Sequence, residues 1–456
     1  MDNAILDRAA DTATSCQIPN KDLNSYALAT QNVDFSQQKS IKFIDLFAGL
    51  GGTRVGFEQA CAEKKRTPEC VFTSEIKHHA IKAYRANFPD CNVSGDITQI
   101  NPDSIPNFDY LLAGFPCQPF SSAGKRNGFL DERGGLFFVI CNILKHKNPS
   151  GFLLENVDGL ASHDSGKTLS TIMLKLTTLG YNVAWKILDA SEFGVAQRRK
   201  RIYIVGHRSH LPNLSGFPVS LVPSRDLIEH DAPFKFTPFT KLLSTKFSIS
   251  HLHGKKIKDK RGGESNIHSW DLELKGLVNT EQKKILEMLL KKRRSKKWAE
   301  AKGIDWMDGM PLTTEEIRTF YDHPDLQTNL DDLVTKRYVR FEHPKKRIIE
   351  QGIAKRVPHV GAPKGYNIVA GKLSFPLACI IDPNDVVPTI VATEVGKIGV
   401  ATDKGVRRMT VREGLNFSGF PKEYILHETD YEGAFDLIGN TVMPPVIKAV
   451  AMRLIG

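Results

Sequence analysis

The sequence predicts an α/β fold with a largely parallel sheet, interrupted by a second, smaller domain before the chain returns to the first. Three observations lead to this prediction. Short apolar runs alternate with helical patterns from Ile41 onward, a glycine-rich turn follows the first run, and the alternation stops after His207. Strands separated by helices of about 10 to 15 residues are typical of βαβ units.

Composition places the chain among globular proteins. It has 456 residues, of which 41% are hydrophobic and 25% charged, enough for one large core or two domains. Because there is no long apolar stretch and no basic-then-apolar start, we expect no membrane partner and a cytoplasmic location. The seven cysteines include no C-x-x-C pair, so neither a disulfide framework nor a metal site is expected.

The charge balance is typical of a protein that binds a polyanion. The net charge is +11 and the pI about 9.1. Basic residues concentrate in "HGKKIKDKRGG" at 253–263 and in "KKILEMLLKKRRSKK" at 283–297. Either run alone fits a solvated helix face as well as it fits a phosphate contact.

Six apolar runs of the first domain are predicted as strands, in the order "IKFIDLF" at 41, "CVFTSE" at 70, "FDYLLAGF" at 108, "GFLLENV" at 151, "YNVAWKILD" at 181 and "RIYIVGH" at 201. The predicted divisions are an N-terminal arm at 1–40, a first domain at 41–207, a second domain at 208–385 and a returning segment at 386–456. In the last segment, Pro444 and Pro445 are expected to start a helix over Val446 to Leu454.

The stretch "FIDLFAGLGG" at 43–52 predicts a strand that enters a glycine turn before a helix. Glycines there allow the backbone to pass close to a nucleoside, although the order G-x-G-x-x-G is absent. Glu75 ends the second strand, where an acid can bind ribose hydroxyls, and Asp96 follows in the next crossover, within reach of an adenine. Each acid alone would be interpreted as a helix cap or surface carboxylate. Together they predict a pocket for an adenosine-containing cofactor.

Cys117, in "GFPCQPFSSAG" at 114–124, follows the third predicted strand. Ligands of open α/β sheets bind at the carboxyl ends of strands, so this cysteine is predicted to lie at the site. A buried structural cysteine is the alternative. The flanking prolines favour a rigid loop over a core strand, and Cys117 is therefore the candidate nucleophile.

Two further motifs carry charged groups at strand ends. Glu155 in "LLENV" follows apolar strand residues, which predicts a partly desolvated acid able to donate a proton, whereas a turn is the alternative. In "QRRKRIYIVG" at 197–206, Arg199 and Arg201 alternate with Tyr203 along one face. Both guanidinium groups are expected to point into the cleft, and protective charges on an edge strand are the alternative.

The ordered set of motifs resembles the C5 cytosine DNA methyltransferase family. It comprises "DLFAGLGG", "GFPCQPFS", "ENV", "QRRKR", "RRMTVREGLNFSGFP" at 407–421 and "IGNTVMPP" at 438–445. The resemblance covers 41–207 and 386–456. It implies a Rossmann-like S-adenosylmethionine-dependent methyltransferase domain, with a smaller target recognition domain inserted at 208–385.

The resemblance also implies the cofactor and the site residues. S-adenosylmethionine would be held with Glu75 on the ribose and Asp96 on the adenine. The Cys117 thiolate would add to C6 of cytosine, Glu155 would act at N3, Arg201 would hold O2 and Arg199 would help to order the site. No metal is implied. The implied cofactor-binding residues are Phe47, Gly49, Leu50, Gly51, Glu75, Ile76, Asp96, Ile97, Gly114, Pro116, Leu136, Asn440 and Val442.

The partner implied by the resemblance is double-stranded DNA, from which one cytosine would be flipped out. The layout resembles bacterial restriction-modification enzymes, which implies a monomer that works at the nucleoid, with a cognate restriction endonuclease as a separate protein. A tRNA cytosine methyltransferase of the same architecture is the nearest alternative, but its usual Cys-Phe-Thr signature is absent. A catalytically silent DNA-binding relative is another alternative.

Overall fold

The computed structural model describes residues 40–116, 135–234, 236–259, 263, 265–305, 309–350, 353–369, 375–391, 397–426 and 430–455. The residues from Ser40 onward belong to one compact unit. Residues 1–39 lie outside the described residues, and so does the segment 117–134.

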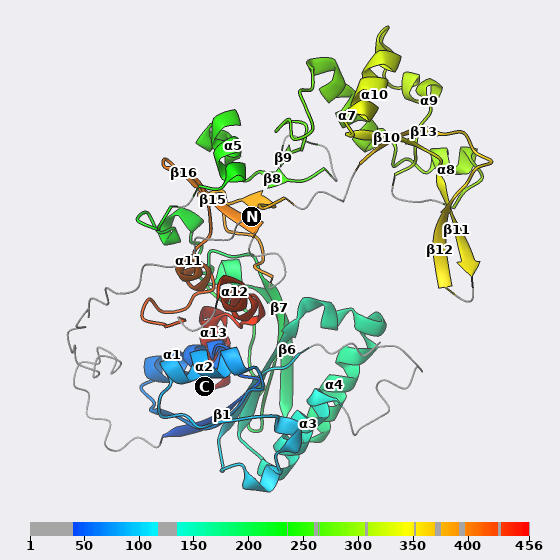
Figure 1. Cartoon of the computed structure of the whole chain (residues 1–456). Helices are drawn as coiled ribbons and strands as arrows, with labels where there is room; N and C mark the ends of the chain where they lie inside the picture. Colours follow the sequence, from blue (N-terminus) through cyan, green and yellow to red (C-terminus); the bar gives the residue numbers. More distant parts are fainter. Residues whose placement is uncertain are drawn as a thin grey trace, which may run out of the picture. The chain divides into compact units, whose positions relative to one another are not determined.

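A seven-stranded sheet, in the order β3-β2-β1-β4-β5-β7-β6, forms the centre of the first domain (Figure 1). The five strands from β3 to β5 are parallel, and β7 is antiparallel to both of its neighbours. This confirms the predicted α/β class. The strands are β1 (Ile41–Leu46), β2 (Pro68–Ser74), β3 (Val93–Ser94), β4 (Tyr110–Gly114), β5 (Gly151–Val157), β6 (Asn182–Asp189) and β7 (Lys200–His207).

The antiparallel strand β7 has a simple cause. Parallel neighbours need a crossover of a dozen or more residues, usually a helix. The link from β6 to β7 spans residues 190–199 and contains only one short 3₁₀ turn. Such a link can only reverse the chain, so β7 runs back beside β6 and inserts between β6 and β5.

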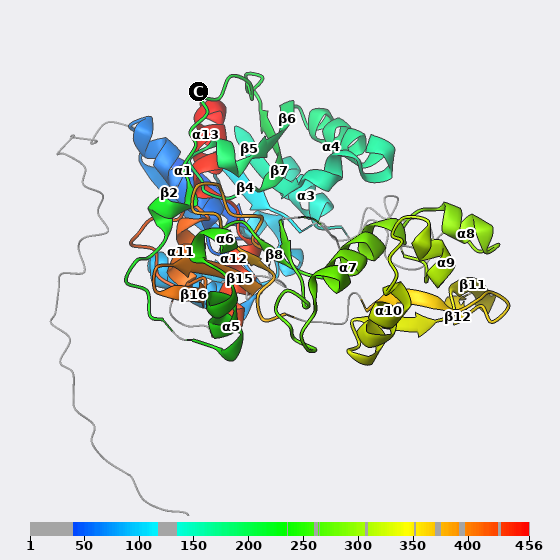
Figure 2. The ribbon, with the colours of Figure 1, turned by 90° about the horizontal axis from the view of Figure 1, so that it is seen from above.

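Helices cover both faces of this sheet (Figure 2). Successive strand residues point to opposite faces, and in β1 this places Phe43 against α1 and α13, whereas Ile44 belongs to the core beneath α3 and α4. The sheet is therefore buried on both sides, as its apolar strands require. The helices of this domain are α1 (Gly52–Glu63), α2 (His78–Asn87), α3 (Leu136–Lys147), α4 (Lys167–Thr178) and α13 (Pro444–Leu454), with 3₁₀ turns η1 (Ile97–Gln99), η2 (Pro102–Ser104), η3 (Asp158–Ala161), η4 (His163–Gly166) and η5 (Ala190–Glu192).

The C-terminal segment packs on the first domain. Helix α13 begins at Pro444, as the sequence predicts, and lies along α1. The contact is close because α1 carries glycines: a Cβ on Gly52 would lie 2.1 Å from the Val442 carbonyl oxygen, and one on Gly56 would lie 2.4 Å from that of Pro444. The same segment contains α11 (Val411–Asn416) and α12 (Tyr431–Asn440).

A second sheet of five short strands joins the middle of the chain to the C-terminal segment, in the order β16-β15-β14-β8-β9. The boundary predicted at 385 therefore falls inside one sheet and one apolar core, since Leu243 and Val406 belong to the same cluster. The strands are β8 (Lys256–Ile257), β9 (Asn266–Ile267), β14 (Cys379–Ile380), β15 (Ile398–Thr402) and β16 (Gly405–Arg408). Near this sheet lie η6 (Ser224–Leu227), α5 (Pro238–Lys246) and α6 (Ile249–Leu252).

The middle of the chain has an apolar core of its own around Trp270, Leu289 and Leu330. Two separate two-stranded sheets belong to this region, β10 with β13 and β11 with β12. Its elements are α7 (Thr280–Lys292), α8 (Lys297–Ala301), α9 (Thr314–Arg318), α10 (Leu326–Thr335), β10 (Val339–Glu342), β11 (Lys345–Glu350), β12 (Ile353–Pro358) and β13 (Gly365–Ile368). Among the described residues, no helix is both long enough and apolar enough to cross a membrane.

Candidate active site

The glycine turn after β1 is shaped by its backbone. Phe47, Gly49 and Gly51 all have positive φ angles, of 56°, 53° and 73°. A Cβ on Gly51 would lie 2.6 Å from the Phe88 ring, so only glycine fits there. Leu50 is buried beneath the turn. Helix α1 begins directly after the turn, and no side chain caps its N-terminus. Free N–H groups are thus available at this strand end.

Glu75 follows β2 and holds the glycine turn in place. Its buried carboxylate accepts hydrogen bonds of 2.8 Å from the backbone N–H groups of Gly49, Ile76 and Lys77. A carboxylate oxygen has two lone pairs, so these bonds leave acceptor capacity for a ligand hydroxyl. Glu75 is therefore both the support of the turn and an acceptor at the open strand end.

Asp96 and Ile97 lie at the next strand end, after β3. The exposed Asp96 carboxylate caps η1 by accepting from the Thr98 backbone N–H at 2.9 Å with its Oδ1 atom. Asp96 can cap η1 and still accept a hydrogen bond from an adenine, because its carboxylate has a second oxygen. Ile97 is buried beneath it, whereas Ile76 is 71% exposed. The exposed Ile76 side chain, next to Glu75 in the sequence, offers an apolar surface to a flat ring.

Gly114, at the end of β4, links this region to the neighbouring strand. A Cβ there would lie 2.9 Å from Val442 Cγ2 and 3.6 Å from Glu155 Oε2. A methyl group at 114 would therefore push against Val442 and contact Glu155. Pro116 is exposed two residues later, and the nucleophile candidate Cys117 falls outside the described residues. Among the described residues, Gly114 is where the predicted cofactor-binding residues (the cofactor side) and the predicted catalytic residues (the base side) meet.

Two other predicted cofactor residues lie at helix ends. Leu136 is the first residue of α3 and is partly buried. Asn440 is the last residue of α12, and its side-chain amide donates to the Asp436 backbone oxygen at 2.7 Å, within its own helix. Its side-chain oxygen is the group left for a ligand.

Glu155 is a buried acid with a positively charged neighbour. It lies in β5, 7% exposed, and its Oε1 atom is 3.1 Å from Arg201 Nε at the start of β7. Burial raises the pKa of the Glu155 carboxyl group, and Arg201 and Arg199 oppose that increase only in part. A carboxyl group held in one position with a raised pKa is suited to proton donation.

Comparison with known proteins identifies the chain. Residues 41–456 match the model of a family described as C-5 cytosine-specific DNA methylase. The chain belongs to this family. It is 51% identical over 424 residues to the Type II methyltransferase M.NlaIV of Neisseria lactamica, which covers 91% of the chain and 99% of the relative. It is 38% identical over 436 residues to M.BanI of Aneurinibacillus aneurinilyticus, which covers 90% of the chain and 94% of the relative.

The structure is similar to solved structures of the same architecture. One of Spodoptera frugiperda DNMT2, a mutant form, matches with a TM-score of 0.50 at 19% identity, covering 91% of this chain and 100% of that one. At that identity the likeness bears on the fold. It supports the Rossmann-like arrangement that the methylase motifs imply.

The two arginines of the methylase motif "QRRKR" have different surroundings. Arg201 contacts Glu155, whereas the Arg199 guanidinium, 3% exposed, donates to the backbone carbonyls of Ile390, Gly439 and Thr441 at 3.2, 3.1 and 2.9 Å. Arg201 thus lies beside the other candidate catalytic group, as expected, whereas Arg199 points to the backbone of the C-terminal segment. Burial, with Arg201 nearby, lowers the pKa of Arg199 to about 10. Arg199 is placed to position the C-terminal segment.

Gln197 makes the same kind of contact and was not singled out from the sequence. It is fully buried, donates to the Phe417 carbonyl at 3.1 Å and accepts from the Ile390 N–H at 3.0 Å. Gln197 and Arg199 thus form a latch, a pair of side chains that holds the C-terminal segment through its backbone. The sequence did offer a signal for this pair: Gln197 and Arg199 are two residues apart just before a strand, a spacing that places both on one side of the chain.

Two further supporting residues were also missed. Asn156, beside Glu155, donates from its amide to the Phe115 carbonyl at 3.0 Å and so fixes the exit of β4. Asp45, at the end of β1, is fully buried and accepts from Thr53 Oγ1 at 2.6 Å and from the Tyr84 hydroxyl at 3.2 Å. Burial raises the pKa of Asp45 to about 7.

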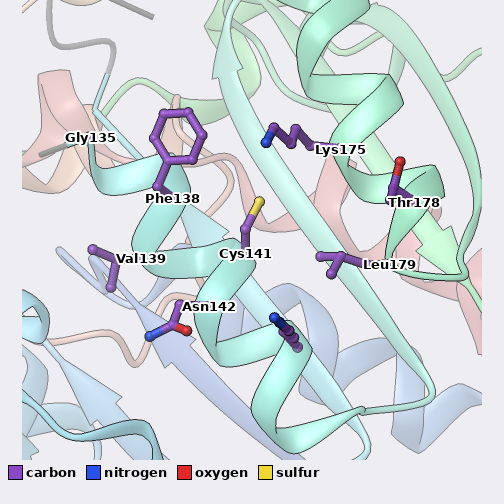
Figure 3. Close-up of a pocket in the computed structure, with 9 residues that line it drawn as sticks. Gly135, Phe138, Val139, Cys141, Asn142, Lys175, Thr178 and Leu179 are labelled. Atoms are coloured by element: carbon purple, nitrogen blue, oxygen red, sulfur yellow. The ribbon is translucent and has the colours of Figure 1, made fainter. Parts of the chain in front are cut away.

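A pocket of about 590 Å³ opens between α3 and α4 (Figure 3). Cys141 lines it, and burial raises the pKa of that thiol to about 12, which leaves it unreactive. Lys145 and Lys175 supply its charge. Leu136 and the other predicted site residues are not among those that line it, so we assign it no part in the chemistry.

Proposed function

We propose that this protein transfers a methyl group from S-adenosylmethionine to C5 of cytosine in duplex DNA. The surroundings of Glu155 carry the proposal. This acid is buried, its pKa is raised, Arg201 contacts it and Gly114 lies beside it. The relatives are named Type II methyltransferases, which supports modification of DNA in a restriction-modification system.

The residues at the strand ends fit S-adenosylmethionine. The positive φ angles of the glycine turn, and the rings against which a Cβ on Gly51 would collide, keep the backbone bare there. Glu75 offers a carboxylate oxygen to ribose hydroxyls, Asp96 offers one to the adenine amino group, and Ile76 covers the ring. S-adenosylmethionine, when bound, supplies an electrophilic methyl group.

The chemistry of cytosine explains the catalytic groups. C5 of cytosine is a poor nucleophile until a group adds at C6. Proton donation from Glu155 to N3 draws electrons from C6, and the Cys117 thiolate then forms a bond there, which makes C5 nucleophilic. After methylation, loss of the C5 proton to solvent, departure of the thiolate and return of the N3 proton to Glu155 restore the ring and the enzyme.

Arg201 has two parts in this scheme. Its guanidinium fixes the rotamer of Glu155 and places a positive charge beside the cytosine O2 position, where negative charge develops. Arg199 acts one step further away, because it holds the backbone around Val442 in place. We therefore regard Arg199 as a positioning residue.

Duplex DNA as substrate determines the remaining assignments. A stacked cytosine cannot reach Glu155, so the base is flipped out of the helix. We infer a monomer acting on DNA at the nucleoid of the bacterial cytoplasm, with a cognate restriction endonuclease as a separate protein. Target recognition is assigned to residues 208–385.

The direct test is methyl transfer from labelled S-adenosylmethionine to unmethylated duplex DNA, followed by mapping of 5-methylcytosine at base resolution. We expect label at one short sequence motif, and none with Cys117→Ala or Glu155→Gln protein. Label on tRNA alone would contradict the DNA assignment, and the absence of transfer despite bound cofactor would indicate a silent relative.

A further inference from the structure

The hairpin of β11 and β12 separates its charges between two faces. Each strand of the hairpin pairs with the other and with no further strand of the described residues, and Figures 1 and 2 draw it as a ribbon of two strands. In such a pair, directly opposite residues point to the same side, and sides alternate along each strand. The register, with Lys345 opposite Pro358, Arg347 opposite Arg356 and Ile349 opposite Ala354, therefore places these six side chains on one face.

One face, here called the basic face, carries only positive charge and is exposed throughout. No residue on it is acidic, and Ile349 on the same face is 73% exposed. Among the described residues, no carboxylate forms an ion pair with its basic groups. The basic face consists of Lys345, Arg347, Ile349, Ala354, Arg356 and Pro358.

The opposite face carries charges of both signs, with Lys346 and Lys355 against Glu350. Glu350 and Lys355 form an ion pair of 2.7 Å there. Ile348 and Val357 on this face are partly buried. The acid of the hairpin thus lies on the side away from the basic face. Charges that only keep a strand edge soluble would have no reason to separate in this way.

Arg347 and Arg356 are directly opposite each other in the register. Like charges in this position destabilise a hairpin, because their side chains lie within about 5.5 Å at the Cβ atoms. An arrangement that costs stability in the free protein is favourable when a polyanion neutralises both groups. The occupant indicated by this charge is the phosphate backbone of DNA.

We propose that the basic face of the β11–β12 hairpin is a DNA-binding arm that contacts backbone phosphates. This rests on the proposed function, which supplies duplex DNA as partner. A two-stranded ribbon also has a width that the major groove admits. Phosphate contacts carry no sequence information, so the arm fixes the position of the protein on any duplex.

The test compares two double variants of the same hairpin that remove equal charge from opposite faces. R347Q/R356Q strips the basic face, and K346Q/K355Q strips the other. The affinity for a fluorescent mixed-sequence duplex is measured by anisotropy over a range of salt concentrations. We expect R347Q/R356Q to weaken binding at least tenfold at about 0.1 M salt and to reduce the slope of log K against log salt by about 2.

The control K346Q/K355Q should keep the wild-type slope. R347Q/R356Q should melt no lower than wild type, because it removes a repulsion, and both variants should keep the wild-type affinity for S-adenosylmethionine. An unchanged slope in R347Q/R356Q, or equal losses in both variants, would overturn the proposal. The binding measurement needs no methyl transfer. Absence of methylation by wild-type protein would therefore count against the proposed function, whereas the salt slopes alone decide whether the arm binds DNA.

Discussion

The two sides of the site each contain one buried carboxyl group whose pKa is raised, yet the two groups have different surroundings. Asp45, on the cofactor side, is fully enclosed and bonded to the hydroxyl groups of Thr53 and Tyr84. Glu155, on the base side, faces the Arg201 guanidinium at the sheet end. A raised pKa alone therefore does not mark a catalytic acid. We propose that a guanidinium group in direct contact and a place beside the open strand end distinguish Glu155 as the candidate catalytic acid.

The largest effect that would test this comparison is on catalysis. Glu155→Gln removes the proton donor but keeps the shape, so kcat for methyl transfer should fall by about 10²- to 10⁴-fold. Cofactor affinity, measured by calorimetry, should stay unchanged because Glu155 is not among the residues proposed to bind the cofactor. Glu69→Gln, an exposed acid at the start of β2, is the control. A rate within about threefold of wild type would refute the role of Glu155.

Asp45 should act on stability with a defined sign. Its folded pKa of about 7 lies above its ordinary value of 3.8, so between these pH values the folded state holds a proton that the unfolded state has lost. Stability should therefore fall as pH rises through this window, by at most about 1.4 kcal/mol per pH unit. Asp45→Asn should remove this contribution in urea unfolding at about pH 5 and about pH 8. The exposed Asp90→Asn variant should behave as wild type, and identical pH profiles for all three would contradict the assignment.

The latch of Gln197 and Arg199 holds the C-terminal segment, which lies against both the cofactor side and the base side. A change in the latch therefore tests both sides together. Arg199→Ala leaves three buried carbonyls without a donor, and we expect a loss of about 2 to 3 kcal/mol in the free energy of unfolding. Arg198→Ala, which removes an exposed ion pair with Asp385, should cost less than about 1 kcal/mol. Equal losses measured by urea unfolding would show that Arg199 does not hold the segment.

The smallest expected effect concerns the point where the two sides meet. Gly114→Ala forces a methyl group to within 2.9 Å of Val442, and overpacking of this kind costs about 1 to 3 kcal/mol. We expect a lower melting temperature and weaker cofactor binding. Gly159→Ala adds the same methyl group with no atom within 4 Å and should change neither. If Gly114→Ala protein keeps the wild-type melting temperature and cofactor affinity, the absence of a side chain at position 114 is not needed.

Much of the first domain could be predicted from the sequence. All six predicted strands are present, and the family match confirms the resemblance. Strand β3 was missed because two residues show no periodicity. The antiparallel direction of β7 was not predicted, because it follows from the short link between β6 and β7 and not from the apolar pattern of the strand. The five-stranded sheet was out of reach, because strands of two to five residues pair there across long separations in the chain.

For the site, sequence patterns predicted the acids better than the arginines. Glu75 and Glu155 lie at strand ends, and strand ends can be inferred from apolar runs. Alternation along a strand gave Arg199 and Arg201 a common face, but it could not reveal that backbone carbonyls surround Arg199. Those carbonyls come from residues 390–441, which local periodicity cannot place. The roles of Cys117 and of the cofactor-binding residues stay predictions.

The pairing of α1 with α13 has a consequence for synthesis of the protein. A ribosome makes α1 hundreds of residues before it reaches Pro444, where the partner helix begins. At about 5 to 20 residues per second, the delay is on the order of 20 to 80 s. For that time the glycine-lined, apolar side of α1 has no native cover. We therefore expect the nascent chain to be prone to aggregation, and to need chaperones, until α13 has been made.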